Sequence, residues 1–103
     1  RPLDLLIAMD ARAMAYFNLQ NMQSSLTDLE IAGLQLQQYR DNETVKEHYQ
    51  RLSGINNYRK GRVMFAEGNY QGACNAFQQA RLYGIKVEQQ YLQPCMAGGS
   101  TGK

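Results

Sequence analysis

The feature that most constrains this chain is an internal repeat. When the sequence is shifted by 48 residues against itself, identical residues align without a gap: Ile7 with Ile55, Phe17 with Phe65, Asn21 with Asn69, Gln23 with Gln71, Ala32 with Ala80 and Leu34 with Leu82. Self-similarity at a fixed period is the signature of repeat architectures. The chain of 103 residues is therefore expected to contain two copies of one structural unit.

Each copy has the pattern of a helical hairpin. In the first, Leu6, Met9, Ala13 and Tyr16 recur at three- and four-residue spacing, which gives one apolar stripe on a helix. Turn signals follow at Asn21 and at Gly68-Asn69, and no strand-like alternation is present. The pattern predicts an all-α chain with helices at about 3–19, 22–39, 44–67, 70–83 and 86–93.

The helix boundaries follow from local signals. Thr44 and Glu47 form a capping-box pattern that predicts a helix start at residue 44, and Gly54 is a place where this helix could kink or split. Pro94 is expected to end the last helix. We expect one helical domain at 1–94, with repeat one at about 3–39, repeat two at about 44–84, a capping helix at about 86–93, and a flexible Gly-rich tail at 95–103.

The second copy resembles a tetratricopeptide repeat. The residues that carry this resemblance are Gly61, Gly68, Tyr70, Ala73, Phe77 and Ala80. The first copy is similar through Ala13, Tyr16, Met22, Leu29 and Ala32, with Gln20 in place of the turn glycine and Ser25 in place of the small alanine. The resemblance implies antiparallel helical hairpins stacked as a short solenoid of two repeats plus a capping helix.

Two departures from that family follow from the sequence. The family's period is about 34 residues, so the 48-residue period implies elongated helices, and the proline that often ends such repeats is missing. Solenoids usually need about three repeats for stability. We therefore expect a homodimer or a larger array, with a monomer capped by residues 86–93 as the alternative. Because the chain begins at Arg1, we also expect further sequence upstream.

Composition excludes several classes of function. The net charge is +2, which does not provide the concentrated basic patch that nucleic acid requires. No apolar run approaches the roughly 20 residues of a membrane span. His48 is expected at the surface, Cys74 as a small buried residue and Cys95 in the tail. One histidine and two cysteines without nearby partners predict no disulfide scaffold, no metal site and no catalytic centre. Residues 97–103 resemble a phosphate-binding loop but have no preceding strand or following helix, so no cofactor is expected.

The candidate binding residues come from the resemblance, which implies that the first helix of each hairpin lines a partner-binding groove. The matching positions are Asp10, Met14, Phe17, Asn18, Tyr58, Arg59, Arg62 and Phe65. Two arginines among aromatics suit an acidic partner or a C-terminal carboxylate; the alternative for Met14, Phe17 and Phe65 is simple packing. We expect a non-catalytic protein–protein interaction module. The alternative is a self-assembly segment of a larger complex, such as a bacterial envelope or secretion machine. The expectation of a bacterial source rests on the Gln-rich helices.

Overall fold

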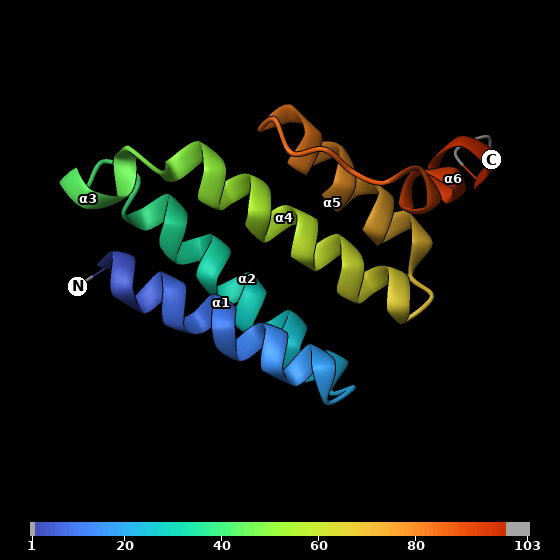
Figure 1. The fold of residues 1–103 in the computed structure, drawn as a ribbon, viewed down its shortest axis with the longest axis horizontal. Helices are drawn as coiled ribbons and strands as arrows, with labels where there is room; N and C mark the ends of the chain where they lie inside the picture. The colour runs from blue at the N-terminus through green and yellow to red at the C-terminus, as the bar shows by residue number, and fades with distance from the viewer. Residues whose placement is uncertain (1, 99–103) are drawn as a thin grey trace.

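The computed structural model describes residues 2–98 of the chain (Figure 1). Within that range 81% of residues are helical and no strand occurs, so the expected all-α class is confirmed. The helices are α1 (Pro2–Asn18), α2 (Met22–Gln38), α3 (Glu43–Lys46), α4 (Tyr49–Ala66), α5 (Tyr70–Leu82) and α6 (Gln89–Gly98). None of the helices in this range is both long enough and apolar enough to cross a membrane.

The two hairpins, α1–α2 and α4–α5, turn in the same way at positions 48 residues apart. Gln20 and Gly68 both adopt positive φ, at 63° and 84°. The next residue is in each case an asparagine whose side chain caps the following helix: Asn21 accepts from the Ser24 amide, and Asn69 accepts from the Gly72 amide. The repeat expected from the sequence is therefore visible in backbone geometry, and a glutamine occupies the conformation that glycine supplies in the second copy.

Helix α4 is the central element, because it packs against α2 on one side and α5 on the other (Figure 1). The buried residues form three clusters. One joins Leu6, Ala32, Leu36 and Val45 at one end of the first hairpin, one joins Ala13, Leu29 and Val63 between the hairpins, and one joins Ala73, Phe77, Ala80 and Val87 in the second hairpin. Equivalent positions of the two copies, such as Leu29 and Phe77, are thus buried in both hairpins.

The predicted continuous helix at 44–67 is wrong. The chain forms the single-turn α3, breaks at Glu47 and His48, and then continues as α4. The cap is Asn42, whose side chain accepts from the Thr44 amide at 3.0 Å, rather than the expected Thr44–Glu47 box. The break follows from packing, because it lets the fully buried Val45 of α3 contact the Leu6–Leu36 cluster.

Gly54 neither kinks nor splits α4, in which it is a buried interior residue. A Cβ at this position would lie 2.6 Å from Cγ1 of Ile85 and 3.0 Å from Cβ of Tyr83. Carbon atoms in contact normally stay about 3.5–4.0 Å apart. The glycine is therefore needed because the segment after α5 runs directly against α4.

The C-terminal expectations also need correction. Helix α6 starts at Gln89 instead of residue 86 and continues through Pro94 to Gly98, so residues 95–98 belong to a helix and not to a flexible tail. Cys95 forms a disulfide with Cys74 of α5, with 5.3 Å between the two Cα atoms. This bond differs from the sequence-based expectation of a small buried Cys74 and a Cys95 in the tail. The bond links α6 covalently to α5. Residues 99–103 of the predicted tail, with most of the phosphate-loop-like segment, lie outside the described residues.

Candidate functional site

The eight candidate residues lie on two helices. Asp10, Met14, Phe17 and Asn18 are on α1, and Tyr58, Arg59, Arg62 and Phe65 are on α4. Two contacts join the helices at these positions. Arg59 forms an ion pair with Asp10, and the guanidinium carbon of Arg62 lies 5.2 Å from the centroid of the Phe17 ring. The structure thus brings together four of the eight residues in two cross-helix pairs.

The Asp10–Arg59 pair is partly shielded from water, since the two side chains are 32% and 30% exposed. Burial raises the pKa of the Asp10 carboxyl above its ordinary value, and the charge and hydrogen bond of Arg59 oppose that rise. An ion pair at this degree of exposure contributes little net stability. Its effect on the site is to fix the two side chains across the gap between α1 and α4.

Met14 and Phe17 are half-buried and pack against the cluster formed by Ala13, Leu29 and Val63. Asn18, the last residue of α1, is exposed. The two apolar candidates on α1 therefore contribute to the contact between the hairpins, which is the packing alternative considered for them above.

Tyr58 and Phe65 are covered by the C-terminal segment. The Phe65 ring lies 5.1 Å from that of Tyr91, and the Tyr58 ring lies 5.8 Å from that of Phe77. The Tyr58 hydroxyl donates a hydrogen bond of 2.6 Å to Glu88. Burial, strengthened by this hydrogen bond, raises the pKa of Tyr58 to about 12. These two aromatics contribute to the contact with α5 and the C-terminal segment and remain partly exposed.

A groove of about 450 Å³ lies between α1 and α4, with α2 beneath it. Among its lining residues are Leu3, Ile7 and Asp10 from α1, Ala32 and Leu36 from α2, and Arg51, Leu52, Ile55 and Arg59 from α4, with His48 at the start of α4. Apolar side chains make up most of the lining from α1 and α2, and the α4 side carries two arginines, Arg51 and Arg59. It contains two of the eight candidates, Asp10 and Arg59.

Sequence reasoning missed most of this groove, although one signal pointed to it. Ile7 and Ile55 are identical residues at equivalent positions of the two copies, and both line the groove. Ile7 is 55% exposed, whereas Ile55 is half-buried. An exposed apolar side chain that lines a groove together with other apolar side chains indicates a contact surface.

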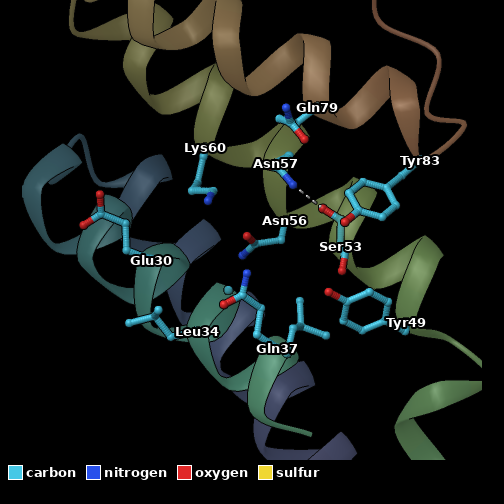
Figure 2. Close-up of a pocket in the computed structure, with 12 residues that line it drawn as sticks. Glu30, Leu34, Gln37, Tyr49, Ser53, Asn56, Asn57, Lys60, Gln79 and Tyr83 are labelled. Carbon is cyan, nitrogen blue, oxygen red and sulfur yellow. Dashed lines mark hydrogen bonds between the residues drawn. The ribbon is translucent and has the colours of Figure 1, made fainter. Parts of the chain in front are cut away.

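A second cavity, of about 510 Å³, opens on the other side of the contact between α2 and α4, where α5 forms its third wall (Figure 2). Its lining is polar, with side-chain amides from all three helices, two tyrosines at one end, and two oppositely charged side chains, Glu30 and Lys60. Asn57 Nδ2 donates to the Ser53 carbonyl at 2.9 Å, as Figure 2 shows.

Comparisons with protein-family models, with curated proteins and with solved structures find no match to this chain. Within residues 2–98, no three His, Cys, Asp or Glu side chains are grouped so that they could hold a metal ion. The candidate sites of the chain are therefore defined by their geometry: an apolar groove with a cationic side, and a polar cavity behind it.

Proposed function

We propose that this chain is a non-catalytic protein–protein interaction module, built as a short tetratricopeptide-like stack of two hairpins, and that the groove between α1 and α4 binds an acidic segment of a partner protein. The observation that carries the proposal is the exposed Ile7, which faces a preformed groove together with Ile55. An apolar side chain of the partner inserted between them would cover the surface that Ile7 leaves exposed to water.

The charge of the groove supports an acidic partner. Arg51 is exposed on the rim and forms no ion pair within residues 2–98. Asp10 already compensates Arg59, so Arg51 is the cationic group of the lining that is left for the partner. A segment with an apolar anchor and neighbouring carboxylates matches this arrangement.

The unsatisfied side chain of Arg62 supports a partner contact near the C-terminal end of α1, where Arg62 lies over Phe17. Its Nε is buried and has no hydrogen-bond acceptor among the described residues. A buried donor without an acceptor is uncommon in native structures. A carbonyl or carboxylate of a bound segment that passes over Phe17 would satisfy it.

The test is selection of binding peptides from a random library on the immobilised chain, followed by affinity measurement with matched variants. We expect the selected peptides to share an aliphatic or aromatic anchor flanked by Asp or Glu. Ile7→Asn should weaken binding about tenfold or more, as expected for an anchor contact. Ile31→Asn is the matched control, because Ile31 is exposed on α2 and lies outside the groove.

A charge-reversal pair tests the acidic preference separately. Arg51→Glu should weaken binding of the acidic peptides, whereas Arg81→Glu, at a position on α5 that is also exposed, should not. Equal losses in the Ile7 and Ile31 variants, or no enrichment of peptides at all, would show that the groove is not a binding site.

The second candidate function, self-assembly into a homodimer or a larger complex, is favoured by a different surface. Ile31 and Leu34 are 40% and 67% exposed and stand three residues apart on α2, so they share one face of that helix. Sedimentation analysis over a range of concentrations distinguishes the two functions. A monomer at high concentration that still binds peptides supports the groove, and a dimer that Leu34→Asn dissociates supports assembly.

A further inference from the structure

The polar cavity between α2, α4 and α5 contains one cation and one anion that do not pair with each other. Glu30 and Lys60 both line it, but they form no ion pair within residues 2–98. Figure 2 shows Lys60 reaching from α4 into the space in front of α2, the helix that carries Glu30. The cavity shares Leu36 and Asn56 with the groove on the other side of the α2–α4 contact, whereas Glu30 and Lys60 line the cavity alone.

Lys60 is half-buried and has no ion-pair partner among residues 2–98. Burial lowers the pKa of its ammonium group, and the Glu30 carboxylate only partly opposes that shift. Its side chain makes no hydrogen bond or ion pair with any residue from 2 to 98. A half-buried ammonium group without an ion-pair or hydrogen-bond partner costs free energy, and an anionic group bound in the cavity would reduce that cost.

Gly33 lets the side chains of Asn56 and Lys60 lie close to the backbone of α2. A Cβ at position 33 would lie 3.7 Å from the Lys60 Nζ and 3.0 Å from the Asn56 Oδ1. Glu30 precedes Gly33 by three residues, so its carboxylate stands on the same side of α2, one turn away. The absence of a side chain at Gly33 therefore lets the Lys60 ammonium group lie against the same face of α2 that carries Glu30.

The other lining side chains offer both donors and acceptors. Asn56 Nδ2 donates to the Leu29 carbonyl at 2.9 Å, and Asn57 Nδ2 donates to the Ser53 carbonyl at 2.9 Å. These hydrogen bonds fix both amides while leaving their oxygens as acceptors. Gln79 of α5 adds a further amide to the wall of the cavity (Figure 2).

We propose that this cavity binds a small zwitterion, an α-amino acid or a short peptide with both ends free, whose carboxylate pairs with Lys60 and whose ammonium group pairs with Glu30. A dianion such as phosphate is disfavoured, because Glu30 would repel it and Lys60 is the only cation in the lining. A neutral ligand would leave both charges unpaired. The volume of about 510 Å³ falls within the usual range for small-molecule sites.

The test is titration of the intact chain with L-glutamine and with the dipeptide alanyl-glutamine, followed by NMR of the side-chain amides. Saturable shifts of the Asn57 and Gln79 amides are expected, without shifts of Asn18, which is exposed on α1. The two probes separate a free amino acid from a peptide as the preferred source. N-acetyl-L-glutamine lacks the ammonium group and L-glutamine amide lacks the carboxylate, so each should bind about tenfold more weakly or worse.

Two variants link each charge to its end of the ligand. Lys60→Met should abolish the preference for L-glutamine over its amide, and Glu30→Gln should abolish the preference over the N-acetyl form. Lys86→Met and Glu43→Gln, at exposed positions outside the cavity, should retain both preferences. The proposal is overturned if neither zwitterion saturates by about 50 mM, if the blocked forms bind equally well, or if the preferences survive the two cavity variants.

Discussion

The disulfide between Cys74 and Cys95 allows a quantitative prediction about stability. The bond joins α5 to α6 across a sequence separation of 21 residues. In the chain-entropy account, closing a loop of this length in the unfolded state stabilises the native state by about 3 kcal/mol. The double variant Cys74→Ala/Cys95→Ala should lose this amount from its free energy of unfolding. Since each kcal/mol corresponds to roughly 4–8 °C in a domain of this size, its melting temperature should fall by about 15 °C.

The second hairpin should remain folded when the disulfide is absent. Tyr91 of α6 stacks on Phe77 with 5.2 Å between ring centroids and meets Phe65 at 5.1 Å. These ring contacts do not involve the cysteines, so α6 should remain packed against α5 without the disulfide but should separate from it more often. Amide hydrogen exchange should accelerate in α6 far more than in α4.

The assay is urea denaturation of the oxidised chain, the reduced chain and the double alanine variant. The reduced chain and the variant should agree with each other and differ from the oxidised chain. A loss below about 1 kcal/mol would refute the reasoning, because it would mean that the bond does not restrict the unfolded chain as the loop length requires. Unequal losses in the reduced chain and the variant would show that the alanines act through packing instead.

Three further predictions address the fold. Gln20→Gly should stabilise the chain by about 1 kcal/mol and Gly68→Gln should destabilise it by a similar amount, because both positions require positive φ; chemical denaturation measures both. Phe77→Ala should cost about 3–5 kcal/mol since Phe77 is fully buried, whereas Leu82→Ala, at a position 78% exposed, should change the melting temperature little. A hydrogen bond from Arg12 lowers the pKa of Asp28. The ionised Asp28 carboxylate therefore stabilises the fold at pH values above the ordinary Asp pKa. This stabilisation is lost as the pH falls through the lowered pKa of Asp28. Asp28→Asn should flatten the acid limb of the stability curve, and an unchanged limb would contradict this assignment.

The repeat made the hairpins predictable from sequence. Asn21 and Asn69 stand 48 residues apart, and turn chemistry is local, so both turns and the four long helices could be located before any contact was known. The break at Glu47 and His48 could not, because it depends on where Val45 is buried against α1 and α2. A local capping pattern carries no information about that contact.

The candidate site was less predictable because it depends on how the two copies are stacked. The ion pair of Asp10 with Arg59 joins non-equivalent positions of the two copies, which self-alignment alone does not pair. The disulfide has the same origin, since Cys74 meets Cys95 only when the chain after α5 folds back along that helix. The covering of Tyr58 and Phe65 by Glu88 and Tyr91 follows from the same fold-back.

The central claim is that the groove between α1 and α4 is where a partner binds. Its most direct test is to map the backbone amide shifts of the intact chain on addition of an acidic peptide selected against it. The account predicts shifts concentrated at residues 3–10 of α1 and 51–59 of α4, which line the groove. Shifts confined to α5 and α6, with both groove segments unchanged, would contradict it.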